Sequence, residues 1–172
     1  MRNLIIGEIV EKLSFVEANI ITGLKGDVDR TRSLVFLLKE MEKDKEDLRI
    51  IFWEIYSTFP SKKIILESLS VEVKTGVFFF VLETLVKNSR GAREIKISSK
   101  IEGGNLLLIY EDDGISVPSD HKEKVFSKRG MPEMFIVKML IEDMGGTIIE
   151  NGIPRKGTRF VISIPSKCWS VL

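Results

Sequence analysis

Polar side chains that could share one ligand lie in two places in the chain. Thr84 and Asn88 are four residues apart in the sequence LETLVKNS, within a run whose apolar residues recur every four positions. This recurrence predicts a helix over 77–92 with one broad buried face, and it places the two polar residues one turn apart on the same side. The acidic sequence DDG at 112–114 follows an alternating run that predicts a strand. A helix carrying this polar pair beside such a strand could bind a ligand between the two motifs.

The two motifs resemble the ATP-binding domain of sensor histidine kinases, in the superfamily that also contains gyrase B, Hsp90 and MutL. The family's helix reads LxNLxxNA, so Asn88 matches the second asparagine, a ligand of the Mg²⁺ in Mg-ATP, while Thr84 replaces the first. The family's DxGxG box binds the adenine amino group through its aspartate. Asp112 and Gly114 match this box, and Ser116 replaces its second glycine. The resemblance implies a Mg-ATP site with Asn88 as the metal ligand and Asp112 as the adenine acceptor.

Later motifs resemble the same domain but depart from it where phosphates would bind. Gly157 and Thr158 resemble the family's Gly-Thr near the adenine pocket, and the sequence EKVFSK at 123–128 resembles its phenylalanine box. The family then has a lid and a GxGLxI box, whose glycines open a helix N-terminus to the phosphates. Here the lid is shorter, Pro132 lacks an N–H, and Glu133 adds a negative charge. These changes indicate that ATP binding is weakened or lost.

The residues needed for hydrolysis and phosphotransfer are also replaced. ATP-hydrolysing relatives carry a glutamate one turn before the metal-binding asparagine, where Thr84 cannot act as a base at neutral pH. The phosphoacceptor box of histidine kinases, FxxNxSHELRTPL, can be laid without a gap on residues 15–28, and Thr22 then falls on the histidine. The only histidine of the chain, His121, lies in a polar loop after the DxG box and is interpreted as a solvated residue. We therefore expect no catalytic residue and no autophosphorylation, whereas residual nucleotide binding or kinase activity stays open.

The elements that would position these motifs form an α+β pattern. An apolar stripe over 3–41 predicts a long helix, with Gly23 and Gly26 as sites of a kink or break, and a second helix follows to about Phe59 with Asp44 as a candidate N-cap. Short strands and helices follow it. They are a strand at 63–70, a connection at 71–76, the central helix, a hairpin of 94–101 with 106–112 around Gly103-Gly104-Asn105, a helix at 135–144 ended by Gly145-Gly146, and a hairpin of 147–150 with 159–164 around Asn151-Gly152.

This order predicts two domains. Residues 1–62 would form a helical hairpin that dimerises as a four-helix bundle, because the longer first helix leaves apolar residues without a partner. Residues 63–172 would form a two-layer α/β sandwich of the histidine-kinase ATPase type, as the resemblance implies. The alternative is that the N-terminal segment folds back on its own C-terminal domain.

Composition sets further bounds on function. The 26 Lys and Arg residues nearly balance 25 Asp and Glu residues, which gives no electrostatic argument for nucleic acid. The single Cys168 fits a reducing compartment, and no apolar run has the length of a membrane span. We expect a cytoplasmic protein.

These observations lead to one main hypothesis. The chain would be a cytoplasmic, homodimeric, histidine-kinase-like two-component signalling protein without its phosphoacceptor histidine. As a pseudokinase or adaptor it would bind a response-regulator receiver domain or a partner kinase. The alternative is an ATP-binding protein kinase or anti-sigma-type switch that retains Mg-ATP. A purely structural α/β domain is a third interpretation.

Overall fold

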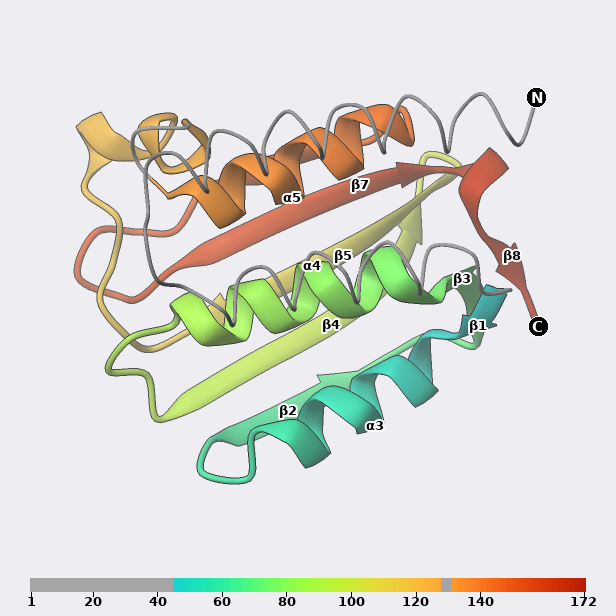
Figure 1. The fold of residues 1–172 in the computed structure, drawn as a ribbon, viewed down its shortest axis with the longest axis horizontal. Helices are drawn as coiled ribbons and strands as arrows, with labels where there is room; N and C mark the ends of the chain where they lie inside the picture. Colours follow the sequence, from blue (N-terminus) through green and yellow to red (C-terminus); the bar gives the residue numbers. More distant parts are fainter. Residues whose placement is uncertain (1–44, 128–130) are drawn as a thin grey trace, which may run out of the picture.

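A computed structural model describes residues 45–127 and 131–172, and its centre is a five-stranded mixed sheet (Figure 1). The strand order is β2-β4-β5-β7-β6, in which β2 runs parallel to β4 and every other neighbouring pair is antiparallel. The strands are β2 (Lys63–Glu67), β4 (Glu94–Glu102), β5 (Asn105–Asp112), β6 (Thr147–Glu150) and β7 (Arg159–Pro165). Along β5 and β7 buried and half-buried residues alternate, as expected for a sheet with one covered face.

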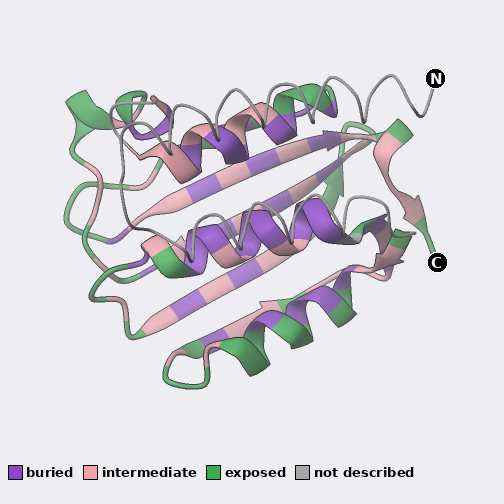
Figure 2. Ribbon diagram, in the orientation of Figure 1, coloured by how far each residue is buried: buried purple, intermediate pink, exposed green. Residues whose placement is uncertain are grey.

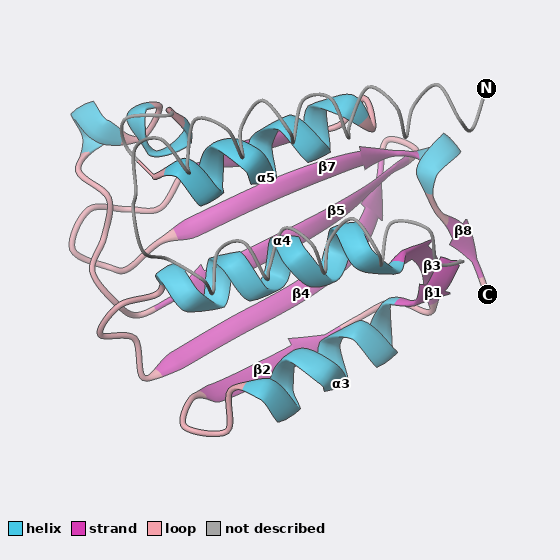
Figure 3. Cartoon of the chain, viewed as in Figure 1, coloured by secondary structure: helices cyan, strands magenta, loops and turns pink. Residues whose placement is uncertain are grey.

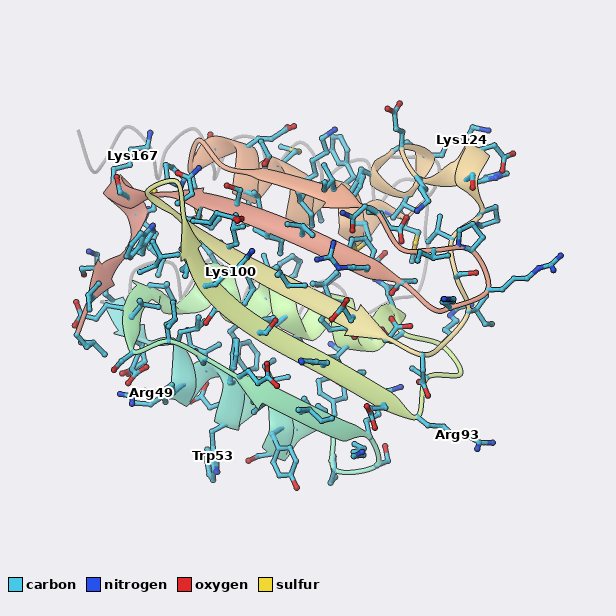
Figure 4. The ribbon with its side chains drawn as sticks, turned by 180° about the vertical axis from the view of Figure 1, so that it is seen from behind. Arg49, Trp53, Arg93, Lys100, Lys124 and Lys167 are labelled. Carbon is cyan, nitrogen blue, oxygen red and sulfur yellow. The ribbon has the colours of Figure 1, made fainter. Side chains whose placement is uncertain are left out.

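Among the described residues, three helices cover one face of this sheet, as Figures 1 and 3 show: α3 (Leu48–Thr58), α4 (Thr75–Asn88) and α5 (Pro132–Asp143). In the described part of the chain no helix lies on the other face, which is seen in Figure 4. The predicted two-layer α/β sandwich is therefore confirmed. Within residues 45–127 and 131–172, no helix combines the length and apolarity that a bilayer crossing requires.

The central helix α4 is buried over more of its circumference than its sequence pattern predicts. It lies between α3 and α5, and apart from the half-buried Phe79 its apolar side chains are at most 6% exposed (Figure 2). They include Val77, Phe78, Val81, Leu82, Leu85 and Val86. A helix that is apolar on all sides is expected in such a position. It ends at Asn88 rather than Ala92, with the Ser89 N–H donating to the Leu85 carbonyl at 3.1 Å.

The two predicted hairpins differ in their connections. Gly103 and Gly104 have φ of 58° and 80°, so the first hairpin has the two-residue turn, with both φ positive, that such glycines favour. The second pair, β6 and β7, forms as predicted, and residues 151–158, which begin with Asn151-Gly152, form a long loop between the two strands. The predicted helix end is also confirmed, since Gly145 has a φ of 78° directly after α5.

A small second sheet is absent from the predicted pattern. It consists of β1 (Lys45–Asp47), β3 (Val71–Lys74) and β8 (Ser170–Val171), in the order β1-β3-β8. The segment predicted as a connection into the central helix is therefore a strand. In this sheet β3 pairs with β8, so that Val71 lies opposite Val171, 100 positions later in the sequence. No local sequence pattern reveals such a pairing.

The predicted second helix forms as α3, and it shares the core of the sandwich. Asp47 caps it, with Oδ1 accepting from the Arg49 N–H at 2.9 Å, whereas Asp44 lies outside the described residues. Its buried face consists of Leu48, Ile51, Phe52 and Ile55, each at most 1% exposed and part of one cluster with α4 and the sheet. The long first helix, its dimer and a boundary at residue 62 stay predictions, because residues 1–44 lie outside the described part.

Candidate functional site

Asp112, at the end of β5, is the centre of the predicted site residues that the structure brings together. It is 7% exposed, and its carboxylate accepts four hydrogen bonds. Oδ2 accepts from the Ser89 hydroxyl at 2.6 Å and from the Thr158 hydroxyl. Oδ1 accepts from the Gly114 N–H at 2.9 Å and the Thr158 N–H at 3.3 Å. We call these residues, with Gly157, the Asp112 cluster.

The two glycines of the Asp112 cluster are required by the fold itself. Gly157 has a φ of 92°, and a Cβ on it would lie 1.7 Å from the Asp112 carbonyl oxygen. A Cβ on Gly114 would lie 2.7 Å from the Arg90 carbonyl oxygen. Both distances are shorter than any ordinary contact, so each backbone approaches its neighbour closely only because the side chain is absent. The sequence matches at Gly114 and Gly157 therefore have a packing role whether or not a ligand binds.

Ser89 is a site residue that sequence reasoning missed. The residue is 6% exposed, and its hydroxyl contacts the Asp112 carboxylate, lies 2.6 Å from the Tyr110 hydroxyl and donates to the Leu85 carbonyl at 3.1 Å in the alternative orientation of its proton. Burial raises the pKa of Tyr110 far above its usual range, so this hydroxyl stays protonated. Ser89 thus links the C-terminal end of α4 to β5. Its position directly after Asn88 in a matched motif was the one available indication.

Two neighbours of the DxG box have local roles. The Asp113 carboxylate accepts from the backbone N–H groups of Glu94 at 3.0 Å and Arg93 at 2.8 Å, and these hydrogen bonds lower its pKa. Asp113 thereby joins the end of β5 to the start of β4. Ser116, at the family's second glycine, accepts from the Arg155 N–H at 2.7 Å, and Arg155 has a positive φ of 67°. Both residues therefore stabilise turns around Asp112.

The two residues of the predicted polar pair on α4, Thr84 and Asn88, differ in how far they are buried. Thr84 is 5% exposed and belongs to the buried part of the helix, whereas Asn88, one turn later, is half-buried. In residues 45–127 and 131–172, no hydrogen-bond partner of the Asn88 side-chain amide is found. Asn88 is therefore the predicted ligand-binding side chain that is available on this helix. In the same residues no three His, Cys, Asp or Glu side chains are grouped as a metal site would need.

The start of α5 is the region where the family's phosphates would bind. Pro132 is the first residue of the helix, Met131 precedes it without a side-chain cap, and Glu133 lies in the first turn. Residues 127–131 alone separate α5 from the short 3₁₀ helix η2 (Lys124–Phe126). A helix N-terminus attracts anions through its free N–H groups and its positive dipole end. Pro132 removes one of these N–H groups, and the Glu133 carboxylate brings a competing negative charge.

Other side chains fix the loops around the Asp112 cluster. Glu150, whose side chain is 1% exposed, forms an ion pair with Lys122 at 2.7 Å and accepts from the Gly152 N–H at 3.0 Å. This pair joins the loop after β5 to the end of β6. Phe126 packs edge-on against Phe160 with ring centroids 6.1 Å apart, so the predicted phenylalanine box anchors η2 to the core. The loop after β5 is thus attached at two points to the neighbouring strands β6 and β7.

The two residues considered for phosphotransfer do not join the site as described. The half-exposed His121 forms a 3.1 Å contact with the neighbouring Asp120 carboxylate, which lowers the pKa of that carboxyl. This surface pair agrees with a solvated loop histidine. Thr22, at the phosphoacceptor position, lies outside the described residues.

Comparison with known families decides the class of the domain. Residues 77–167, which include most of α4, the Asp112 cluster and α5, match the family model of the histidine kinase-, DNA gyrase B- and HSP90-like ATPases. The chain belongs to this family. Two sensor proteins are among its relatives. This chain is 29% identical over 102 residues to the sensor protein KdpD of Escherichia coli (strain K12). It is 26% identical over 106 residues to the sensor protein RprX of Bacteroides fragilis (strain YCH46). Each match covers 53% of this chain, but only 11% and 20% of the respective sensor proteins.

Solved structures share the fold. The catalytic domain of histidine kinase ThkA superposes with a TM-score of 0.64 at 27% identity, over 73% of this chain and 98% of that domain. The histidine kinase AdeS of Acinetobacter baumannii gives a TM-score of 0.63 at 21% identity, over 92% of this chain and 95% of that structure. The predicted resemblance to sensor histidine kinases is confirmed.

The residues present fit only part of the nucleotide that this family implies. The Asp112 carboxylate and the Asn88 amide are the groups that would hold the base and the metal. At the other end, Pro132 and Glu133 do not fit a triphosphate. Because the carboxylate already accepts four hydrogen bonds, a base could bind Asp112 only if one of these donors turned away.

Proposed function

We propose that this protein is a histidine-kinase-like two-component signalling protein that acts by binding a signalling partner rather than by phosphorylating itself. The observation that carries the proposal is the start of α5, where proline and an acidic residue occupy the first turn. A triphosphate placed there would meet a negative charge and one N–H fewer. Thr22 at the phosphoacceptor position supports the same conclusion, because a threonine hydroxyl lacks the nucleophilicity of an imidazole near neutral pH.

The proposed partner is a response-regulator receiver domain, with a complete histidine kinase in a mixed dimer as the second candidate. The resemblance implies that receiver domains dock on the helical bundle of this family. The homodimer would form through the apolar stripe of the N-terminal segment, which includes Leu13, Val16 and Ile20. Such a protein could hold a receiver domain without modifying it.

The alternative is an ATP-binding protein kinase or anti-sigma-type switch that phosphorylates or binds another protein. The observation that favours it is the Asn88 amide, which has no partner in the described residues and remains available to a metal-bound nucleotide. Asp112 would then bind the base. This alternative requires measurable Mg-ATP affinity, whereas the main proposal requires its absence or weakness.

Calorimetric titration with Mg-ATP and Mg-ADP distinguishes the main proposal from the ATP-binding alternative. We expect no binding up to millimolar nucleotide, and no acid-labile, base-stable phosphate on the protein after incubation with ATP. Micromolar binding that is lost in Asp112→Asn would contradict the main proposal and favour the switch. In that case Asn88→Ala should abolish the dependence of binding on Mg²⁺.

A matched variant tests whether the start of α5 is what weakens Mg-ATP binding. Glu133→Gln removes the negative charge and keeps the side-chain size, so any residual Mg-ATP affinity should rise, by about tenfold for 1.4 kcal/mol of relieved repulsion. Glu123→Gln, in the exposed loop before η2, is the control and should leave the affinity unchanged. Equal effects of the two substitutions would show that the first turn of α5 does not limit phosphate binding.

A further inference from the structure

The outward face of α3 carries three large apolar side chains that nothing in the described part of the chain covers. Ile50 is 45% exposed, Trp53 is 67% exposed and Tyr56 is 50% exposed. They are spaced three residues apart on the sides of the helix that the buried residues leave exposed, Ile50 and Trp53 opposite the buried face and Tyr56 at its flank. The exposed polar residues Glu54 and Ser57 lie beside them. Figure 2 shows the exposed residues along the outer side of α3, and Figure 4 shows Trp53 pointing away from the domain.

This arrangement differs from that of an ordinary surface helix. A helix at the surface of a domain normally has one apolar stripe and one polar face, and a helix that is apolar on both sides is normally covered on both. On α3 the inner face is already occupied, because its buried residues belong to the common core with α4 and the sheet. Any further helix that packs on α3 must therefore use Ile50, Trp53 and Tyr56.

We propose that the outward face of α3 is the docking surface for the chain's own segment 31–42. This segment contains the apolar residues Leu34, Val35, Phe36, Leu37, Leu38 and Met41. The chain that precedes the described part ends at residue 44, and β1 then leads directly into α3 at Leu48. Helices joined by so short a connection pack as antiparallel neighbours, which brings this segment alongside α3.

A second copy of α3 is a less suitable occupant. One fully buried aromatic side chain contributes about 150–250 Å², so two aromatic residues and an isoleucine supply well under the roughly 800 Å² per partner of a stable interface. A covalently attached segment needs less area, because the short link gives it an effective concentration on the order of millimolar. The stripe at 9–28 is not used by this contact and stays available for the proposed dimer.

The test uses the full chain, whose two tryptophans are Trp53 and Trp169. Trp169→Phe leaves Trp53 as the only tryptophan. If segment 31–42 covers α3, Trp53 emits as a buried indole and acrylamide quenches it weakly. Replacing Leu34, Val35, Phe36, Leu37 and Leu38 by serine should then shift the emission to that of a hydrated indole and raise the quenching constant several-fold. The single variant Phe36→Ser should give a smaller change in the same direction.

Two controls keep the result specific. Trp53→Phe leaves Trp169, whose Nε1–H donates to the Ile164 carbonyl at 3.2 Å, as a reporter of the sandwich, and its emission should be unchanged by the serine substitutions. Serine at Ile9, Leu13, Val16 and Ile20 should leave Trp53 buried. A hydrated Trp53 in the protein with its native segment would overturn the proposal. A second outcome would also overturn it: Trp53 is buried only at high protein concentration, and the substitutions at 34–38 leave it buried. That result would assign the outward face of α3 to a second copy of the chain.

Discussion

The Asp112 cluster and the start of α5 would face the two ends of one nucleotide, and they differ in how well they match the family. In the cluster, Asp112, Gly114, Gly157 and Thr158 all match, and each of them takes part in contacts within the folded chain. At the start of α5, the family's glycines are replaced, and Pro132 is well tolerated as the first residue of a helix. The matching residues of the Asp112 cluster are therefore ones that the fold itself needs.

This difference changes the meaning of a sequence match. A preserved DxG box and Gly-Thr pair are usually taken as signs of a nucleotide site. Here the carboxylate joins β5, the end of α4 and the loop after β6, so the same residues would be expected in a protein that binds no nucleotide. The start of α5 is the more informative region, because Pro132 and Glu133 stand there in place of the family's glycines. The following predictions test this comparison, beginning with the largest effect.

Gly157→Ala should cause the largest loss of stability. Its Cβ would meet the Asp112 carbonyl oxygen at 1.7 Å with φ at 92°, so we expect the free energy of unfolding to fall by about 4 kcal/mol. Gly103→Ala is the control, because its φ is 58° but nothing lies within 4 Å of the new Cβ, and it should cost about 1 kcal/mol. Urea denaturation measures both. Equal losses would mean that close packing at Asp112 is not what requires Gly157.

Local patterns were sufficient to predict most of the fold. The central helix and the 94–112 hairpin follow from apolar spacing and two adjacent glycines, which are signals within a few residues. The strands β1, β3 and β8 could not be predicted, because they are two to four residues long and are stabilised by pairing across distant positions. The hairpin of β6 and β7 forms around Asn151-Gly152 as predicted, but the close approach of its loop residue Gly157 to Asp112 could not be predicted, because it joins distant positions.

The residues of the candidate site could be predicted only where they match a position of the family's motifs. Asp112, Gly114, Gly157 and Thr158 do come together as the motifs implied. Ser89 was missed because its role depends on the Asp112 carboxylate, which is 23 residues away in sequence. Lys122 and Glu150 were missed for the same reason, because charged residues in a loop and at a strand end give no sign that they form a buried pair.

Lys122→Met should cause the second largest loss of stability. It leaves the Glu150 carboxylate, whose side chain is 1% exposed, without its cation, so we expect a loss of about 3 kcal/mol. Lys63→Met breaks the Lys63–Glu94 pair, whose side chains are 68% and 43% exposed, and should cost less than about 1 kcal/mol. Both variants are compared by denaturation. A small effect of Lys122→Met would show that the loops around the Asp112 cluster are not held by this pair.

Ser89→Ala should have a smaller effect on stability and a diagnostic effect on binding. Removing one hydrogen bond to Asp112 should cost about 1 kcal/mol. It also frees one acceptor position on the carboxylate, so any nucleotide affinity should increase if the occupied carboxylate is what limits base binding. Ser99→Ala, which removes a hydrogen bond to the Leu69 N–H in another part of the sheet, should cost a similar amount without changing the affinity. Unchanged nucleotide binding in Ser89→Ala would leave the start of α5 as the limiting region.

Asp113→Asn should have the smallest effect, and the effect should depend on pH. Backbone hydrogen bonds from Glu94 and Arg93 lower the pKa of Asp113 in the folded protein, so its ionised form stabilises the fold above the pKa of the unfolded chain, about 3.9. As pH falls through the lower folded pKa, the carboxyl is protonated and this stabilisation is lost. The difference in unfolding free energy between the wild type and Asp113→Asn should therefore be present at pH 7 and shrink steadily below about pH 4. Denaturation curves across this range measure it, and a constant difference would show that Asp113 supports the turn through its shape alone.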